Sequence, residues 1–582
     1  MALIGQWVFV PLAVLLLILA FWEPARRRVL GCKGIQRLEK RLTLSERGYW
    51  AAFALILAAG VWVRCYRFTE LPLGMNQDGT MAGVEAFCLL SGGTDQYGTS
   101  WPTYFEAWQF SQMSTLYSYL LIPFIKLLGL SKFSLRLPML LMSLIALPLM
   151  WDAARRIAGK NYALAAMFLL ALNPWHIVLS RWALEANMLP HVLLLAVDLL
   201  LAGMQKRWAL YLSMVLFGLA PYAYGLAAVS VPFILLPAAV FLAARRKVKP
   251  LDLVICVAVF ALVSALVSAP YYVTMAINAF GLETMTLGRM TMPRFAESKR
   301  AGDLALGAEN PYLDMVQKLE SFLPMATGYY RAEDYNGVGW ANTMYPFIAP
   351  AALFGVYKLC RDRRKLALQK SEAPLRDGGM LILIWMFAAM VNTAMVGGVV
   401  NRNNILYYPL ILCAAYALWQ MGRRLKTALA AMVVMVAIGF AGMCGIYFGD
   451  ADYQFATGNY FLSGLQEALD ETWDWDCDRY YLTTMDRSDG QKVMTAQVMF
   501  AHHIDYAMRA EEEELRGRDG EPNGWYFTER YVLQDFSDFE PDPMECAVYI
   551  VRQQEKALFD EADYLITDFG DFAAAYPRYW AE

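Results

Sequence analysis

The chain has 582 residues, of which 58% are hydrophobic and 18% are charged, with 17 Trp, 33 Tyr and 31 Phe. Soluble globular proteins are nearer to half apolar and a quarter charged, so the composition excludes an ordinary soluble protein. The net charge of −3 conceals an asymmetry, because residues 448–582 carry 30 acidic and only 10 basic side chains. The sequence therefore predicts a basic membrane body followed by an acidic soluble domain.

Apolar runs of sixteen to twenty residues recur before residue 448. Each run is long enough to cross a hydrocarbon core of roughly 30 Å as a helix. We predict about twelve transmembrane helices, near residues 4–22, 48–65, 134–152, 161–179, 188–203, 208–221, 229–244, 251–270, 345–360, 379–397, 404–420 and 427–447.

The charges of the short loops predict the topology, since basic loops stay in the cytoplasm. The basic loops are residues 26–41, 155–160, 205–207, 245–249, 361–365 and 422–426. These loops alternate correctly only if the apolar segment 114–130 does not cross the membrane, so we expect it to be interfacial or re-entrant on the outer face. Both termini are then outside, and the large outer regions are 66–133, 271–344 and the part from residue 448.

The first outer region contains "LPLGMNQDGTMAGVEAFCLL", residues 71–90, in which the acid Asp78 is flanked by Gln77 and Gly79. One interpretation is that Asp78 caps a helix beginning near Thr80. The other is that this carboxylate, at the outer interface, acts as a general base toward an acceptor hydroxyl or amine.

A second outer turn, "NPWHIVLSRWALEAN" at residues 173–187, places Arg181 and Glu185 four residues apart. On one helix face these side chains could form an ion pair between belt tryptophans. Alternatively, Arg181 faces an anionic headgroup.

Two further outer turns supply candidate cavity residues. "GLAPYAYGLAAVSVP" (218–232) contains Tyr222 and Tyr224, which line a cavity or belong to the aromatic belt. "GGVVNRNNILYYP" (397–409) contains Asn401, Arg402 and Asn403. Arg402 is a candidate phosphate clamp, because guanidinium groups bind phosphate oxygens bidentately. The alternative is an exposed arginine in a polar loop.

The remaining regions carry weaker signals. Region 271–344 is rich in arginine, aromatic residues and glycine, which suits a partly mobile cover over a site. The acidic region has strand-like pieces at 479–485 and 546–551 and helix-like pieces at 461–472 and 494–515, which predict a small α/β domain. No Cys or His spacing indicates a metal site, and no nucleotide-binding motif is present. A substrate on the outer face must therefore arrive activated and membrane-borne, as a lipid-linked phosphosugar does.

The chain resembles the GT-C integral-membrane glycosyltransferases, most of all family 39, which includes dolichyl-phosphate-mannose protein mannosyltransferases and bacterial lipid A aminoarabinose transferases. The residues that carry the resemblance are "YRFTELPLGMNQDGTMAGVEAFCLLSGGTDQYGTSWPTYFEAW", "LYSYLLIPFIKLLGLSKFSLRLP", "NPWHIVLSR" and "NRNNILYYP". The resemblance implies a first outer loop with the catalytic acid, an inverting transfer from a polyprenyl-phosphate sugar, and Asp78 as that acid.

One departure concerns the acidic pair, Asp-Glu, that the family usually carries, because Gly79 stands at its second position here. Glu85 or Glu106 would then supply a second carboxylate, or one acid suffices. The departure leaves the need for a divalent cation open. Arg181 and Arg402 carry over as donor-phosphate contacts, and the expected cavity residues are Gln77, Glu106, Glu185, Tyr222, Tyr224, Asn401 and Asn403.

We therefore expect a helical GT-C-like membrane protein with three parts. Residues 1–47 form a first transmembrane helix and a basic loop, 48–447 the catalytic membrane domain, and 448–582 an extracytoplasmic α/β domain. The expected activity is glycosyl transfer at the outer face of a bacterial plasma membrane to an unspecified protein, wall polymer or lipid. The alternatives are a lipid-linked sugar transporter, which internal repeats would favour, and a non-catalytic assembly protein.

Overall fold

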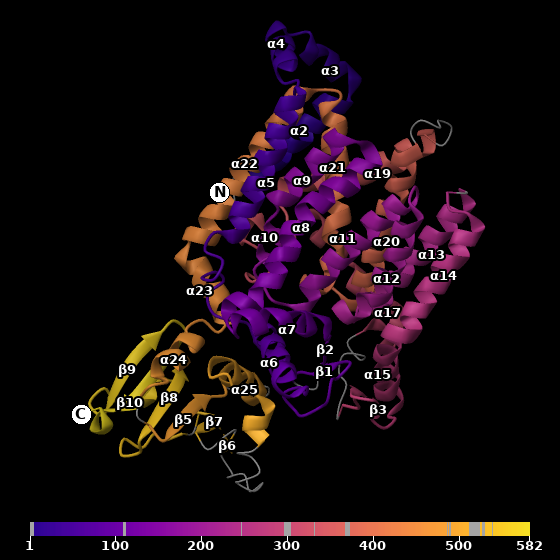
Figure 1. The fold of residues 1–582 in the computed structure, drawn as a ribbon. Coiled ribbons are helices and arrows are strands. Elements are labelled where there is room, and N and C mark those ends of the chain that lie inside the picture. Colours follow the sequence, from indigo (N-terminus) through magenta and orange to yellow (C-terminus); the bar gives the residue numbers. More distant parts are fainter. Residues whose placement is uncertain are drawn as a thin grey trace.

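The computed structural model describes residues 5–108, 112–245, 247–295, 304–330, 332–366, 373–475, 477–485, 487, 490–510, 524–526, 530–537 and 539–581. A bundle of long helices makes up most of the molecule, and a small sheet domain lies at one end of it (Figure 1). Helices α3 (Glu23–Leu30) and α4 (Lys33–Arg41) stand at the opposite end. The predicted division into a helical membrane body and a C-terminal α/β domain is confirmed.

Eight helices of the described chain are long and apolar enough to cross a membrane, and the bent pair Trp7–Phe21 and Glu23–Leu30 would make nine. The eight are α5 (Glu46–Cys65), α8 (Lys132–Ala158), α11 (Glu185–Gly203), α13 (Ala227–Ala244), the run Pro250–Phe280 made by α14 (Pro250–Val263), η3 (Ser264–Ser268) and α15 (Ala269–Phe280), α20 (Ala373–Val396), η8 (Asn401–Leu406) with α21 (Tyr407–Gly422), and α22 (Lys426–Gly449).

Three other predicted spans do form helices, but they are short or charged. The predicted span 161–179 divides into α9 (Lys160–Ala171) and α10 (Pro174–Leu179), because the Asn173 side chain caps α10. α12 (Arg207–Ala223) has 17 residues, and α19 (Ala349–Leu366) ends in a basic stretch. All of them lie inside the bundle (Figure 1). Length and composition therefore do not confirm twelve crossings, and that number stays a prediction.

The segment 114–130 forms one short helix, and its interfacial position on the outer face stays a prediction. This helix is α7 (Leu116–Leu128), whose 13 residues span about 20 Å at 1.5 Å per residue, short of a hydrocarbon core. α7 packs beside α6 (Gln77–Gly92) at the end of the bundle that carries the sheet domain (Figure 1). The short strands β1 (Phe105–Glu106) and β2 (Gln112–Met113) connect the two helices.

Region 271–344 packs on this same end. Its hairpin, β3 (Met285–Leu287) and β4 (Met290–Met292), joins the first outer region, where the Thr103 backbone N–H donates to the Thr291 carbonyl over 3.0 Å. Further along are α17 (Pro311–Leu319) and α18 (Phe322–Thr327). The Trp175 N–H donates to the Thr343 carbonyl over 3.0 Å. The hairpin and the end of this region are thus tied to two of the predicted site turns.

The C-terminal domain contains a six-stranded sheet in the order β6-β7-β5-β8-β10-β9. Strand β5 (Arg479–Thr483) runs parallel to β7 (Tyr531–Gln534) and β8 (Ala547–Arg552), and the other pairings are antiparallel. The remaining elements are β6 (Gly524–Tyr526), β9 (Tyr564–Phe569), β10 (Phe572–Pro577), α23 (Ala451–Tyr460), α24 (Leu465–Thr472) and α25 (Gly490–Ala501). The predicted strands and the first helix are confirmed, whereas part of the second predicted helix lies outside the described residues.

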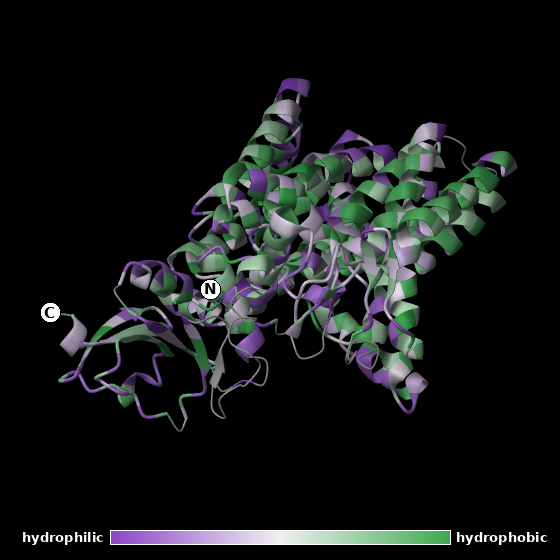
Figure 2. Ribbon diagram, turned by 60° about the horizontal axis from the view of Figure 1, so that its bottom comes forward, coloured by the Kyte–Doolittle hydropathy of each residue, from purple (hydrophilic) through white to green (hydrophobic). Residues whose placement is uncertain are grey.

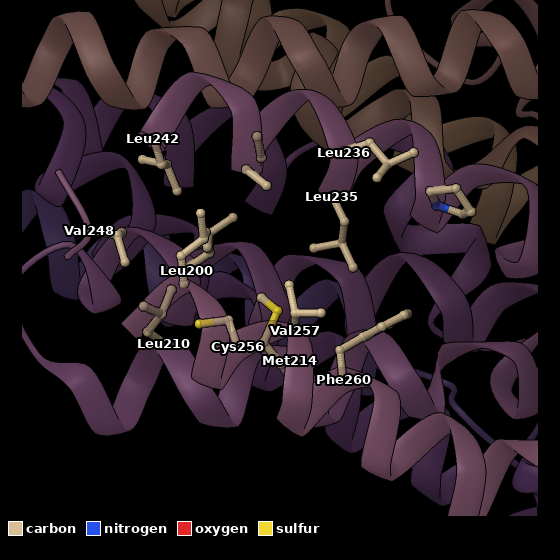
Figure 3. A pocket seen from close by; sticks show the side chains of 14 residues that line it. Leu200, Leu210, Met214, Leu235, Leu236, Leu242, Val248, Cys256, Val257 and Phe260 are labelled. Carbon is tan, nitrogen blue, oxygen red and sulfur yellow. The ribbon is translucent and has the colours of Figure 1, made fainter. Parts of the chain in front are cut away.

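Hydropathy divides the molecule in the same way. The helices of the bundle are mostly hydrophobic along their length, and hydrophilic residues gather at the helix ends and in the loops of the sheet domain (Figure 2). Helices α11 to α14 also enclose a cavity of about 290 Å³ near the basic loop 245–249 (Figure 3). Its lining is entirely apolar, including Leu200, Leu242, Val257 and Phe260. This cavity therefore offers no group that could act on a sugar.

Candidate active site

The start of α6 fixes the position of Asp78. Asn76 is the N-cap, and its Oδ1 accepts from the backbone N–H groups of Asp78 at 3.1 Å and Gly79 at 3.2 Å. The interpretation of Asp78 as the cap is therefore wrong, because the helix begins three residues earlier than expected. Asp78 instead lies in the first turn, where the helix dipole favours a negative charge.

Aromatic side chains surround Asp78. Its Oδ1 accepts a hydrogen bond of 2.9 Å from the Trp108 indole, and the residue is half-buried. Tyr335 and Tyr460 stack on each other with ring centroids 3.6 Å apart. Burial, and then the nearby Asp78 carboxylate, raise the pKa of Tyr460. The Asp78 carboxylate thus accepts from an oriented indole donor and lies beside aromatic rings.

The C-terminal domain reaches this site. Gln77 Oε1 accepts a hydrogen bond of 3.1 Å from Arg487, and the Gln497 side chain donates to the Met75 carbonyl over 3.3 Å. The expected cavity residue Gln77 therefore lies where the two domains meet.

Three buried arginines hold the chain that leads into α6. Arg136 donates to the carbonyls of Phe68, Leu71, Pro72 and Gly74 at 2.7–3.4 Å. Arg64 donates to the carbonyls of Gly60, Leu170 and Ala171. Arg181 donates to the carbonyls of Val63, Tyr66, Arg67 and Leu71. Arg136 and Arg181 thus bind carbonyls at the end of α5 and in the following turn, and Arg64 ties α5 to the last carbonyls of α9.

These contacts bear on both expectations for Arg181. The helix-face pair with Glu185 is wrong, because the chain turns between α10 and α11 and Arg181 lies in that turn. The Arg181 guanidinium is fully buried and lies 5.4 Å from the Tyr447 ring centroid and 5.2 Å from that of Phe448. Its two terminal nitrogens donate to backbone carbonyls. Its surroundings therefore support a positioning role and give no support to a phosphate contact.

A hydrogen-bond relay joins the turn 401–404 to α6. Asn404 Nδ2 donates to Asn187 Oδ1 over 2.8 Å, and Asn187 Nδ2 donates to the Trp182 carbonyl over 3.2 Å. The Trp182 indole then donates to Asn76 Oδ1 over 3.1 Å. Through this relay the structure brings together three of the sequence-predicted turns and fixes them relative to Asp78.

Within the turn 401–404 the polar residues have different roles. Asn403 is fully buried and donates to the carbonyls of Gly397 and Val399 at 2.7 and 2.8 Å, so it folds the turn instead of lining an open cavity. Arg402 and Asn401 are half-buried on the same turn of η8. Of the two arginines expected to contact phosphate, Arg402 is therefore the one that is not enclosed.

The glycine at the second acidic position has a steric cause. A Cβ on Gly79 would lie 2.8 Å from the carbonyl oxygen of Ala183, closer than real Cβ atoms approach. The first turn of α6 packs against the backbone of the turn after Arg181, so only glycine fits there without a shift. A carboxylate side chain at this position would need that turn to move.

The two other candidate acids are engaged elsewhere. Glu85 is fully buried, accepts from the Gln96 backbone N–H at 3.0 Å and from its side chain at 2.7 Å, and lies two helical turns from Asp78. Burial, and then the neighbouring Asp95, raise the pKa of Glu85 well above that of an ordinary glutamate. Glu106 forms an ion pair of 2.7 Å with Lys492 of the C-terminal domain.

The remaining predicted cavity residues lie around a neighbouring loop junction. Glu185 accepts from the Ser114 backbone N–H, and the Ser114 hydroxyl accepts from the Gly225 N–H over 3.1 Å. Tyr222 is half-exposed, donates to the Val267 carbonyl over 2.8 Å and packs on Tyr271, whereas Tyr224 is buried. These contacts join α7, α11 and the turn before α13.

In the described ranges no group of three or more His, Cys, Asp or Glu side chains is placed to hold an ion. Gly79 cannot contribute a ligand, and Glu85 and Glu106 have the partners given above. No metal-dependent step is therefore assigned to this site.

Sequence reasoning missed Asn76, Trp108, Arg136 and Tyr460. Asn76 carried a usable signal, because asparagine is a preferred N-cap and precedes the helix directly. Arg136 also gave a signal that could have been used, because it is an isolated arginine in an apolar run. Trp108 and Tyr460 carried none, since their proximity to Asp78 arises from tertiary packing.

The chain is similar to known proteins in part of its sequence and in its fold. Residues 113–272 match the family model described as dolichyl-phosphate-mannose-protein mannosyltransferase. A comparison with curated proteins finds no match. The crystal structure of ArnT from Cupriavidus metallidurans bound to undecaprenyl phosphate is similar, with a TM-score of 0.51, 14% identity, and coverage of 91% of this chain and 98% of that one.

A weaker similarity is to the oligosaccharyltransferase of Archaeoglobus fulgidus in its apo form, with a TM-score of 0.43 and 14% identity over 78% of this chain and 60% of that one. The family match and the fold shared with ArnT confirm the resemblance to the GT-C glycosyltransferases predicted from the sequence. With that resemblance, the prediction of a membrane glycosyltransferase is confirmed.

Proposed function

We propose that this chain, a membrane glycosyltransferase with the GT-C fold, transfers a sugar from a polyprenyl-phosphate donor to an acceptor at the outer face of a bacterial plasma membrane. The observation that carries the proposal is the half-buried Asp78, held by Trp108 at the start of α6 beside two stacked tyrosines. Helix α6, which carries Asp78 in its first turn, lies at the end of the bundle opposite the basic helices α3 and α4 (Figure 1), and by the positive-inside rule we take that end as the outer one. The undecaprenyl phosphate held by ArnT supports this class of donor.

Asp78 acts as the general base in one displacement. Its carboxylate takes the proton of an acceptor hydroxyl or amine while that oxygen or nitrogen bonds to the anomeric carbon of the donor. The bond from this carbon to the phosphate oxygen breaks in the same step, and its electron pair leaves with the polyprenyl phosphate. A single displacement inverts the anomeric configuration. The Trp108 indole keeps the carboxylate oriented toward the acceptor.

Arg402 contacts the donor phosphate in this proposal. It lies half-buried on η8, and the relay through Asn404, Asn187 and Trp182 fixes η8 relative to α6. A guanidinium there would neutralise the charge that develops on the leaving phosphate. Arg181 has a positioning role, because it holds the end of α5 and the turn that precedes α6.

The test uses the full chain in proteoliposomes with a polyprenyl-phosphate sugar labelled in the sugar. We expect label to leave the lipid, free polyprenyl phosphate to appear in equal amount, and the product to have the opposite anomeric configuration. Arg402→Gln should weaken donor use about tenfold, mainly in KM, while Arg402→Lys retains more activity. Retained configuration, or label that crosses the bilayer while still attached to its lipid, would refute the proposal.

A further inference from the structure

The end of the bundle opposite Asp78 contains another cavity, which is polar and has a volume of about 360 Å³. α8 begins at Lys132, which pairs with Glu467 of the C-terminal domain, and its 27 residues carry the chain about 40 Å to this cavity. Three arginines line it: Arg155, Arg156 and Arg423. Its volume falls within the usual range for ligand pockets.

The cavity forms where three helix ends meet. α8 ends at Ala158 and is followed by Gly159, whose φ of +82° suits glycine, and α9 begins at Lys160. The first turn of α20 contributes Pro374, and α21 ends at Gly422, immediately before Arg423. The arginines are thus placed by rigid helix termini and not by a long loop.

Positive charge exceeds negative charge in the cavity. Arg155 pairs with Asp152 over 2.6 Å, and Arg156 shares Asp152 and pairs with Asp198 over 3.0 Å. The Arg423 guanidinium lies 5.1 Å from the Trp419 ring centroid, and among the described residues no carboxylate is within ion-pair distance of it. Two carboxylates therefore face three guanidinium groups, which is the chemistry that binds phosphate.

The surroundings place this charge at the level of lipid headgroups. The Arg155 guanidinium lies 5.1 Å from the Trp151 ring centroid, and Trp151 contacts Trp50, which is 48% exposed. Exposed tryptophans of this kind mark the membrane–water interface. The cavity is also lined by Ile157 and Leu375, which suit the apolar part of a lipid.

We propose that this cavity binds the phosphate headgroup of an anionic phospholipid in the leaflet at the basic end, opposite the catalytic site. Basic pockets between transmembrane helices on the cytoplasmic side are suited to anionic headgroups. A soluble phosphate shares the same charge chemistry. The adjoining tryptophans and apolar lining favour the lipid.

The test measures binding of phosphatidylglycerol to the full chain in neutral detergent, by native mass spectrometry and by thermal stabilisation. We expect Arg423→Gln to weaken binding about fivefold, the effect of one cation near a membrane surface. Arg423→Lys should stay within twofold of the wild type. The matched control is Arg361→Gln on α19, because this exposed arginine at the same end of the bundle lies outside the cavity.

Three results would overturn the proposal. The first is an equal loss of binding in Arg423→Gln and Arg361→Gln, which would make the effect one of general charge. The second is binding of phosphatidylcholine as strong as that of phosphatidylglycerol. The third is full displacement of the lipid by millimolar inorganic phosphate, which would assign the cavity to a soluble anion. Melting of each variant without lipid shows whether it is folded.

Discussion

Asp78 is held by two neighbours of different kinds. Asn76 binds the backbone of the first turn of α6, and Trp108 binds the carboxylate itself. The sequence singled out Asp78 through its place after an apolar helix and through the family resemblance. The sequence could not predict the hydrogen bond from Trp108 to Asp78, because the two residues are 30 positions apart and meet only when β1 and α7 fold back over α6.

Replacing Trp108 tests this positioning. Trp108→Phe keeps the ring and removes the N–H, so we expect kcat to fall at least tenfold with the donor KM unchanged, since hydrogen bonds to charged groups contribute about 1.5–3 kcal/mol. Steady-state kinetics in proteoliposomes provide the measurement. Trp101→Phe, in the same region but stacked on Tyr119, is the matched control and should keep its kcat. An unchanged kcat in Trp108→Phe would show that the indole does not position the base.

Gly79 gives a second prediction at the residue scale. Gly79→Ala should lower the free energy of unfolding by about 1–3 kcal/mol, because its Cβ would meet the Ala183 carbonyl. Thermal melting would measure the loss. Gly92→Ala lies in the same helix with only an ordinary contact, 3.7 Å from the Thr94 hydroxyl, and should be neutral or stabilising. Equal stability of the two variants would remove the steric explanation for the missing second acid.

At the scale of elements, hydropathy predicted the long helices well, because their apolar length is a local property. It failed where a helix is interrupted or short, as at Asn173, where a capping side chain ends one predicted span. α7 was predicted from its neighbours, since loop charges alternate only if it does not cross. β7, β9 and β10 were not predicted. β7 pairs with β5, which lies about 50 residues earlier, whereas β9 and β10 pair with each other across a short turn.

The docking of the C-terminal domain on the first outer region was also beyond the sequence. Glycines in that region make room for the domain: a Cβ on Gly98 would lie 2.4 Å from the Tyr506 ring, and one on Gly83 2.9 Å from the Phe500 ring. The Lys492–Glu106 ion pair joins the same surfaces. Contacts between residues about 400 positions apart leave no local pattern.

His502 makes the stability of this domain depend on pH. It packs 4.0 Å from the Trp473 ring centroid, and burial lowers its pKa to about 4 from an ordinary value of 6.5. Between these values the unfolded chain binds the proton and the folded chain does not, so stability is present above pH 6.5 and is lost as the pH falls toward 4. The loss is on the order of 3 kcal/mol.

Melting temperatures between pH 7.5 and 4.5 test this dependence. His502→Gln should flatten the acid side of the profile relative to the wild type. His503→Gln, an exposed neighbour, should leave it unchanged. Parallel profiles for the wild type and His502→Gln would show that His502 is not the group responsible.

At the scale of the whole molecule, the basic helices α3 and α4 and the helix α6 that carries Asp78 lie at opposite ends of the bundle (Figure 1). The predicted orientation puts the C-terminal domain outside the cell. In intact cells a membrane-impermeant maleimide should label a single cysteine introduced at the exposed Ala562. It should not label Cys32, which is exposed between α3 and α4 at the basic end. Labelling of Cys32 alone would invert the topology and place Asp78 inside.

The central claim, that Asp78 is the base for transfer from a lipid phosphosugar, is tested most directly by separating binding from turnover. The measurement is single-turnover release of polyprenyl phosphate by Asp78→Asn, with donor affinity determined on the same preparation. The account predicts a rate at least 100-fold below the wild type with donor affinity unchanged, since general bases contribute about 10²–10⁴-fold. Glu106→Gln should keep the wild-type rate. Release by Asp78→Asn within threefold of the wild type would contradict the account.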